Sequence, residues 1–523
     1  MNEAKNWRIE TDGDGIVWLC IDKADSSANV LSEPVLKELA EIIAPYETNP
    51  PRGLVIYSGK RSGFVMGADI NEFTRIESPE QAYELVRLGQ QVLDRLEALR
   101  CPTVAAIDGF ALGGGLELAM ACDYRLALQS KKPILGLPEV QLGIHPGFGG
   151  TVRAVRIMGV RAAMPLMLTG KPITASKAIR QGLTDQIAAP DNWRQAAKEL
   201  IASRKPRACA TLLDRLLNLA PVRPFVARML LKQVRSRARK EHYPAPYAIV
   251  DLWARFGASP KTGYKAEARS IAELMNGQTS RNLVRVFFLQ NKLKSQGEKS
   301  AQKISRVHVI GAGVMGGDIA AWCALRGMNV TLQDRGKEFI DPAIARANKL
   351  FEKKIRDSDD RAATNARLNS DVDGLGIADA DLIIEAIFED LEVKQALYNS
   401  TEPAMKPGAI LATNTSSIRL EDLRTVLQQP EHFFNPVAMR PLVEVIKCRD
   451  TAQEVLNVGF SFIKAIGKFP LGCLSSPGFV VNRVLAPYMA EAMQLAESGV
   501  PLAEIDRTAE DFGMPMGPVE LVD

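Results

Sequence analysis

Two glutamates flank a glycine-rich turn, and their types and spacing could support proton transfer. Three glycines occupy positions 113–115, and Glu117 follows them after Leu116. Glu139 comes after a second turn, Gly136-Leu137-Pro138. Addition of water beside a carbonyl group needs two such acids, because one activates the water and the other handles the proton on the α-carbon. The residues alone also allow a plainer interpretation, in which Glu117 is a first-turn helix acid and Glu139 a solvated loop acid.

The elements around this turn would position both acids. Thr103 to Ile107 is an apolar, β-branched run with the length of a buried strand. The segment LELAMAC at 116–122 has the composition of a helix. A glycine turn that opens a helix leaves backbone N–H groups pointing outward at the positive end of the helix dipole. Such a turn can hold a developing oxyanion.

A third segment carries a family resemblance. Residues 54–59 predict another strand, and GADI follows at 67–70. Together with ALGGGLE at 111–117 and GLPE…GIHPGFGG at 136–150, this closely resembles the enoyl-CoA hydratase/isomerase (crotonase) family. The resemblance implies that the backbone N–H groups of Ala68 and Gly114 hold the thioester carbonyl of an acyl-CoA substrate. It also implies that Glu117 and Glu139 are the catalytic pair.

Composition bounds the class of protein. The 523 residues are 46% hydrophobic and 24% charged, as in ordinary globular proteins of roughly three or four domain-sized units. A net charge of +4 does not argue for a nucleic-acid partner. The seven cysteines show no CxxC spacing, no signal or transit pattern begins the chain, and no apolar run reaches about 20 residues. We therefore expect a cytoplasmic protein with reduced thiols and no transmembrane segment.

The sequence predicts helices in the middle of the chain. Strand and helix signals alternate to about residue 128, and helical composition then continues to about residue 300. The basic run at 223–240 has interleaved apolar residues, which favours a helix with a solvated basic face over contact with CoA phosphates. The polar stretch at 295–303 is typical of a linker between domains.

A dinucleotide-binding pattern follows the linker. A short strand ends at Ile310, Gly311-x-Gly313-x-x-Gly316 opens a helix, and a second strand at 329–333 ends at Asp334. Strand, glycines, helix, strand and acid in this order favour NAD, because the acid would bind the ribose hydroxyls and repel a 2′-phosphate. The alternative is a helix that packs tightly on a strand without a cofactor. Val314 and Met315 lie within the same predicted turn.

The remaining segments resemble the 3-hydroxyacyl-CoA dehydrogenase family. They are ADLIIEAIFEDLEVK (380–394), ILATNTSSI (410–418), HFFNPVAMRPLVEVI (432–446) and SPGFVVNRVLAPYM (476–489). The resemblance implies that His432 is the base that deprotonates the 3-hydroxyl group and that Glu444 orients it. By the same match, Ser416, Asn435 and Asn482 are polar active-site residues, and Glu389 and Lys394 line the cofactor side. The chain has three further histidines, His145, His242 and His308. We expect a loop role for His145, a structural role for His308 and no metal site, because no two histidines have ligand spacing.

Together the two resemblances cover nearly the whole chain, which is similar to the bacterial multifunctional α-subunits of fatty-acid β-oxidation. They imply an α/β architecture: a crotonase-like (ββα spiral) domain at 1–190, a helical region and linker at 191–303, a Rossmann domain at 304–475, and the start of an all-helical domain at 476–523. The expected enzyme hydrates 2-enoyl-CoA, isomerises 3-enoyl-CoA, and oxidises 3-hydroxyacyl-CoA with NAD. The expected partner is a thiolase β-subunit in a hetero-oligomer.

Two departures from the family pattern leave alternatives open. The sequence stops early in the helical C-terminal domain, which predicts an exposed apolar helix face near 490–502, and Gln429-Pro430-Glu431 shortens the approach to His432. Because proline cannot donate to a sheet ladder, this histidine could be delivered differently. One alternative is therefore an active hydratase/isomerase with an NAD-binding but impaired dehydrogenase half. The other is a non-catalytic assembly subunit.

Overall fold

The chain folds into two compact units. The computed structural model describes residues 5–130, 132–298, 300, 302–437 and 441–522. One unit comprises Met1–Phe287 and the other Phe288–Asp523. The four domains expected from the sequence are a finer division than these two units, and their boundaries stay predictions.

The first unit is built on a six-stranded sheet in the order β1-β2-β3-β4-β6-β9. Only β1 is antiparallel to its neighbour, and the other pairs are parallel. The predicted strand at 103–107 is β4, and the one expected at 54–59 is β3, shifted by one residue. The strands are β1 Trp7–Thr11, β2 Ile16–Ile21, β3 Gly53–Ser58, β4 Thr103–Ile107, β6 Tyr124–Leu128 and β9 Gln186–Ala188.

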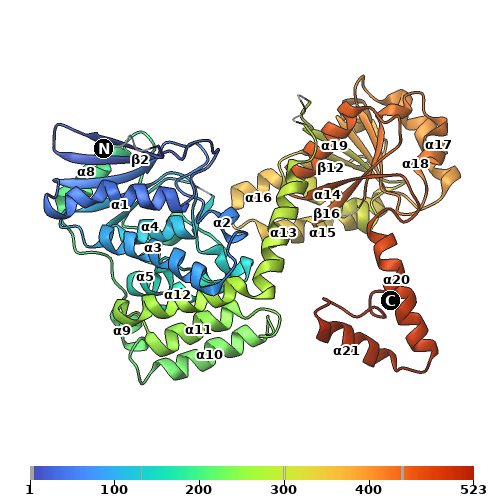
Figure 1. Ribbon diagram of the computed structural model, residues 1–523. Coiled ribbons are helices and arrows are strands. Elements are labelled where there is room, and N and C mark those ends of the chain that lie inside the picture. The colour runs from blue at the N-terminus through green and yellow to red at the C-terminus, as the bar shows by residue number, and fades with distance from the viewer. Residues whose placement is uncertain (1–4, 131, 299, 301, 438–440, 523) are drawn as a thin grey trace. The chain divides into compact units, whose positions relative to one another are not determined.

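A small second sheet and a series of helices complete this unit (Figure 1). The small sheet joins β5 Ala111–Leu112, β7 Pro133–Gly136 and β8 Ile173–Thr174. The helices are α1 Glu33–Thr48, α2 Ile70–Phe73, α3 Pro79–Glu97, α4 Gly114–Ala121, α5 Gly150–Met158, α6 Val160–Thr169, α7 Ala175–Arg180, α8 Trp193–Ser203, α9 Leu212–Leu217, α10 Arg223–Arg235, α11 Ala245–Phe256 and α12 Pro260–Asn276. Helix α13, Gln278–Ser295, contains the boundary between the units.

Both faces of the large sheet are buried, as its apolar strands require. In β2, Val17 and Leu19 point into the main core beneath α1, α3 and α4, whereas Trp18 points to the opposite face, against α8. This alternation follows from the two-residue period of a strand. A third cluster joins α3 to α12 through side chains such as Val86 and Ile271. Helix α12 is thereby fixed beside the glycine turn.

The second unit is built on an eight-stranded sheet in the order β12-β11-β10-β13-β14-β15-β16-β17. The first six strands are parallel, β15 and β16 are antiparallel, and β17 is parallel to β16. Strand β11 has the bounds that the sequence predicted for the second Rossmann strand, 329–333. The strands are β10 Arg306–Ile310, β11 Asn329–Gln333, β12 Leu368–Ser370, β13 Leu382–Glu385, β14 Ile410–Thr413, β15 Phe433–Val437, β16 Leu442–Lys447 and β17 Phe469–Leu474.

The helices of this unit follow the order that a dinucleotide-binding fold requires, because α14 follows the first strand of the pattern directly. The two last helices expose Met493 and Leu502, so the apolar face predicted near 490–502 is confirmed. In the part of the chain that the structure describes, none of the helices combines the length and apolarity of a membrane span. The helices are α14 Val314–Leu325, α15 Lys337–Lys354, α16 Ser358–Asn365, α17 Leu391–Thr401, α18 Leu420–Leu423, α19 Gln453–Ala465, α20 Val481–Glu497 and α21 Leu502–Phe512.

Candidate active sites

The glycine turn of the first unit brings the two predicted N–H donors together. Helix α4 begins at Gly114, and Gly113 before it has a φ of +50°, in the region that favours glycine. A Cβ atom on Gly114 would lie 3.3 Å from the backbone nitrogen of Ala68. Within the described residues, no acceptor receives the N–H of Ala68 or of Gly114. Both groups are therefore available to a carbonyl oxygen between them.

Glu117 is held by the start of another helix. Its side chain is buried, with 2% exposed, and Oε1 accepts hydrogen bonds from the backbone N–H of Phe148 at 2.8 Å and of Gly150 at 2.7 Å. These N–H groups lie at the start of α5, where Phe148 precedes the helix and Gly150 is its first residue, and the helix dipole there also favours a negative charge. Burial, and then the charges of Glu139 and Glu267, raise the pKa of Glu117 well above its usual range. The N–H of Gly150 acts in the opposite direction.

Glu139 has a contrasting environment on the other side of the turn. It lies in the short 3-10 helix Pro138–Leu142, and its Oε1 would lie 2.9 Å from a Cβ atom on Gly113. Both carboxyl oxygens are buried and have no hydrogen-bond partner among the described residues. Burial, reinforced by the charge of Glu267, raises the pKa of Glu139 to about 8. At neutral pH this carboxyl group is mostly protonated.

All four predicted residues line one cavity of about 90 Å³. Most of the wall is apolar, so the cavity suits a hydrocarbon chain that ends at a polar reacting centre. The sequence prediction that the GADI, GGGLE and GLPE segments converge is therefore confirmed. The wall includes Leu31, Met66, Ala68, Phe73, Val86, Gly114, Glu117, Glu139, Leu142, Phe148, Ile271 and Met275.

Sequence reasoning missed a third buried acid, Glu267. It lies in α12 and is fully buried, and it accepts a hydrogen bond of 2.6 Å from the backbone N–H of Gly149. Its position could have been noticed, because Tyr264, Ala268 and Ile271 are buried at helical spacing around it. A charged residue on a buried helix face needs partners, and its presence there indicates a specific role.

His145 also lines the cavity. It is fully buried, with Nδ1 2.7 Å from the carbonyl oxygen of Pro146 and Nε2 2.9 Å from Oγ of Ser270. Burial lowers the pKa of His145 to about 4, so the ring is neutral. The sequence predicted a loop role for His145, and the structure places this histidine in a loop with both ring nitrogens in contact with the protein.

The glycine turn of the second unit fits a dinucleotide. A Cβ atom on Gly316 would lie 1.9 Å from the carbonyl oxygen of Gly311, so only glycine lets α14 approach β10 this closely. A Cβ atom on Gly313 would meet nothing within 4 Å, which leaves open space at the start of α14. Val314 and Met315 are exposed at that helix start. Asp334 ends β11 and accepts a 2.7 Å hydrogen bond from the N–H of Ala312.

Glu389 and Lys394 take part in a polar network beside this turn. Lys394 is fully buried and donates to Oε1 of Glu385 at 2.6 Å, while Glu389 lies 3.6 Å from the same ammonium group. Glu389 also accepts from the N–H of Ser416 at 3.0 Å. Burial acts to raise the pKa of Glu389, but the hydrogen bonds from Thr415 and its neighbours outweigh it and lower the pKa. The network places the exposed Ser416 after the carboxyl end of β14.

The structure does not bring His432 to Glu444. His432 lies in a 3-10 turn, Pro430–His432, before β15, whereas the sequence had left open how the histidine would be placed after the proline. The residue of β15 opposite Glu444 is Val437, five positions later, which is about 16 Å along a strand. His432 instead lines a cavity with Pro407 and Ala409, before the amino end of β14.

Glu444 holds the start of α20 instead. Its Oε1 accepts hydrogen bonds from the backbone N–H of Val480 at 2.7 Å and of Val481 at 3.0 Å. The neighbouring Asn482 is exposed. Asn435 is fully buried and donates to the carbonyl oxygen of Thr415 at 2.7 Å, which places it beside the Ser416 turn. Glu444 and Asn435 are therefore part of the carboxyl-edge region, and His432 is not.

Comparison with known proteins identifies the segments. Residues 14–221 match the family described as enoyl-CoA hydratase/isomerase. Residues 306–476 match the NAD binding domain of 3-hydroxyacyl-CoA dehydrogenase, and residues 478–523 match its C-terminal domain. The fatty acid oxidation complex subunit alpha of Idiomarina loihiensis is 34% identical over 542 residues, which cover all of this chain and 76% of the relative. That of Shewanella frigidimarina is 35% identical with the same coverage.

Solved structures match single parts of the chain. The 3-hydroxybutyryl-CoA dehydrogenase of Escherichia coli K12 is 35% identical, with a TM-score of 0.41, and the match covers 42% of this chain and 49% of that one. An enoyl-CoA hydratase of Mycobacterium avium subsp. paratuberculosis is 19% identical, with a TM-score of 0.38, and the match covers 54% of this chain and 98% of that one.

Proposed function

Because this chain belongs to the family of the fatty acid oxidation complex subunit alpha, we propose residue roles for the reactions of that family. The chain combines an enoyl-CoA hydratase/isomerase with an NAD-dependent 3-hydroxyacyl-CoA dehydrogenase of fatty-acid β-oxidation. The observation that carries the proposal is the convergence of Glu117, Glu139 and the N–H groups of Ala68 and Gly114 on one cavity.

In the hydration of a 2-enoyl-CoA, the two N–H groups would bind the thioester oxygen. When water adds to the β-carbon, negative charge moves onto this oxygen, and the donors of Ala68 and Gly114 stabilise it. The donors are backbone groups fixed by α4 and by the segment that precedes α2. They need no reorganisation as the charge develops.

The environments of the two glutamates divide the proton transfers between them. Glu117 accepts two backbone N–H hydrogen bonds, which favour its ionised form against the burial that raises its pKa. We therefore assign to Glu117 the acceptance of a proton from water while the water oxygen bonds to the β-carbon. Glu139 is unpaired and mostly protonated, so it donates its proton to the α-carbon. The product gains one hydroxyl group and one hydrogen. Two acids with separated roles are the arrangement that this chemistry requires. Isomerisation of a 3-enoyl-CoA would use the same cavity, with one of the two acids carrying the proton.

The second unit supplies the site for NAD. Bound NAD accepts a hydride from the 3-hydroxyacyl-CoA. We propose that Gly311, Gly313 and Gly316 admit the pyrophosphate at the start of α14, and that Asp334 binds the ribose hydroxyls. A direct His432–Glu444 pair is not part of this proposal, because the register of β15 separates the two residues.

The family name implies a second subunit. The relatives are alpha subunits of a complex, so a beta-subunit partner follows from family membership. We propose that this partner is a thiolase, because 3-ketoacyl-CoA, the product of the dehydrogenase reaction, is the substrate that a thiolase cleaves. A cytoplasmic location stays a prediction.

The test is hydration of a short 2-enoyl-CoA by the full chain, followed by the loss of ultraviolet absorbance of the conjugated thioester. Glu117→Gln and Glu139→Gln should each lower kcat by about 10²–10⁴-fold. Substrate binding should change little, because the oxyanion donors are backbone groups. Asp214→Asn is the matched control, since this buried carboxylate of α9 pairs with Arg161 of α6, and neither residue lines the cavity. Near-normal turnover in both glutamine variants would exclude the pair.

A further inference from the structure

The start of α5 is held by two buried carboxylates in alternation. The N–H groups of Phe148 and Gly150 donate to Glu117, as described above. Those of Gly149 and Thr151 donate to Glu267 at 2.6 and 2.9 Å. Four successive N–H groups therefore point alternately at the reacting acid and at a second acid behind it. If the Glu267 contacts loosen, the donors to Glu117 lose their fixed position.

Glu267 has the contacts of an ionised carboxylate. Besides the two N–H groups, it accepts from the hydroxyl of Thr151 and from Nε2 of Gln90, the latter at 3.0 Å. All four partners act as donors, so both carboxylate oxygens are engaged and a protonated oxygen would face another donor. Burial raises the pKa of Glu267, and these hydrogen bonds act in the opposite direction. An amide in its place could accept on one oxygen only.

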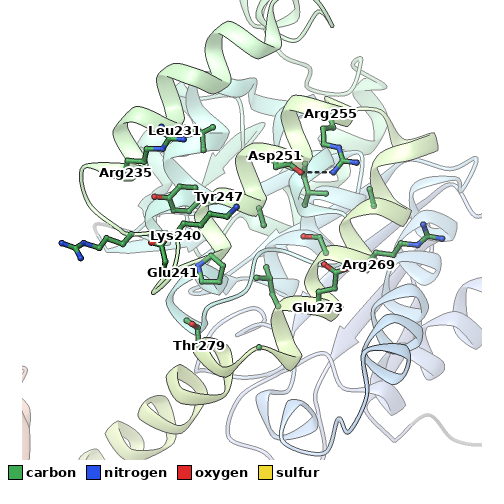
Figure 2. A pocket seen from close by; sticks show the side chains of 18 of the residues that line it. Leu231, Arg235, Lys240, Glu241, Tyr247, Asp251, Arg255, Arg269, Glu273 and Thr279 are labelled. Carbon is green, nitrogen blue, oxygen red and sulfur yellow. Dashed lines mark hydrogen bonds and ion pairs between the residues drawn. The ribbon is translucent and has the colours of Figure 1, made fainter. Parts of the chain in front are cut away.

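Helix α12 holds Glu267 against the start of α5, beside the catalytic cavity. Ile271 and Met275, on the same face, line the cavity wall. The opposite face of α12 lines a separate groove of about 1180 Å³, and Figure 2 shows Arg269 and Glu273 among its lining residues. Gln90 of α3 ties that helix to α12, because its Nε2 donates to the carbonyl oxygen of Tyr264 at 3.0 Å as well as to Glu267. Helix α12 thus lies between the catalytic cavity and the groove, and Glu267 is on the side of the helix that faces α5.

We propose that Glu267 is a positioning residue for hydration: it orients the first turn of α5, so that the N–H groups of Phe148 and Gly150 hold the Glu117 carboxylate toward the attacking water. This rests on the proposed hydratase function and assigns that function a third acid, outside the segment at 14–221 that matches the hydratase family. Its charge has a second effect, because it raises the pKa of both Glu117 and Glu139 and so helps to keep Glu139 protonated at neutral pH.

The experiment compares Glu267→Gln and Glu267→Asp with the wild type and with Asp214→Asn, using 2-butenoyl-CoA as the probe. Glu267→Gln should lower kcat by about 10-fold or more, because misplacement by ~1 Å can cost about 10²-fold. KM should change by less than about 3-fold, since no N–H donor to the thioester is altered. The alkaline limb of the pH profile of kcat, set by Glu139, should move to lower pH as the neighbouring charge is removed.

Glu267→Asp keeps the charge and shortens the side chain. It should lower kcat while leaving the alkaline limb near its wild-type position, and Asp214→Asn should match the wild type in both. The proposal would be overturned by a Glu267→Gln enzyme that has the wild-type kcat and the wild-type alkaline limb of the pH profile. It would also be overturned if this variant lost kcat as predicted while the alkaline limb did not move. If the wild type does not hydrate the probe, or if Glu117→Gln retains turnover, the proposed function fails instead. Thermal unfolding of each variant shows whether it is folded, and the Asp variant provides the test if the Gln variant is not.

Discussion

Replacing Glu139 by glutamine should make the first unit more stable at alkaline pH. In the wild type, the folded state holds a proton on Glu139 up to a pKa of about 8, whereas the usual value is 4.5. A carboxyl group whose folded pKa is raised adds stability below the unfolded pKa, and this stability is lost as the pH rises toward the folded pKa. Glutamine has a similar shape and does not titrate, so the variant should lack this loss.

The size of the effect follows from the pKa. Between pH 6 and the folded-state pKa of about 8, the folded state keeps the proton on Glu139 while the unfolded state is ionised. Over these roughly two pH units, each unit lowers the free energy of unfolding by about 1.4 kcal/mol. The wild type should therefore lose up to about 3 kcal/mol relative to Glu139→Gln. For a unit of this size, 1 kcal/mol corresponds to roughly 2 °C in Tm, which gives a relative shift of about 5 °C.

Tryptophan fluorescence during thermal unfolding is a suitable assay. Four of the five tryptophans, at positions 7, 18, 193 and 253, lie in the unit that contains Glu139. Glu41→Gln on the exposed side of α1 is the control, because it removes the same formal charge from the surface. If the wild type and Glu139→Gln lose the same stability between pH 6 and pH 9, Glu139 is not protonated in the folded state, and its role as the proton donor loses its basis.

Three further predictions concern the second unit. Gly316→Ala should disrupt the packing of α14, because its Cβ would lie 1.9 Å from the carbonyl oxygen of Gly311. Gly313→Ala should fold normally and weaken NAD binding only. Thermal unfolding and NAD titration of both variants check this. Asp334→Ala should weaken NAD and reduce discrimination against NADP, and equal affinity of the wild type for both cofactors would contradict this. His432→Ala should lower NAD-dependent oxidation of a 3-hydroxyacyl-CoA by less than about 10-fold, because His432 lies at the other end of β15 from Glu444. A loss of about 10²–10⁴-fold, typical of a missing base, would show that His432 reaches the substrate.

Local rules allowed much of both glycine turns to be predicted from the sequence. β-branched runs form buried strands, and glycine is required where φ is positive or where a helix approaches a strand closely. Gly113 and Gly316 meet these conditions. The family resemblance carried by the GADI, GGGLE and GLPE segments implied that Glu117 and Glu139 act as a pair, and both line one cavity. These features depend on residues close in sequence or on segments of a recurrent fold.

Tertiary structure alone decided two other features. Glu267 is 116 residues from Thr151 in the chain, and only the packing of α12 against α3 makes it a partner of the α5 turn. The register between β15 and β16 places Val437 rather than His432 opposite Glu444. A motif records which residues follow one another, but a strand advances about 3.3 Å per residue, so the end of the sheet at which a side chain lies depends on pairing with distant strands.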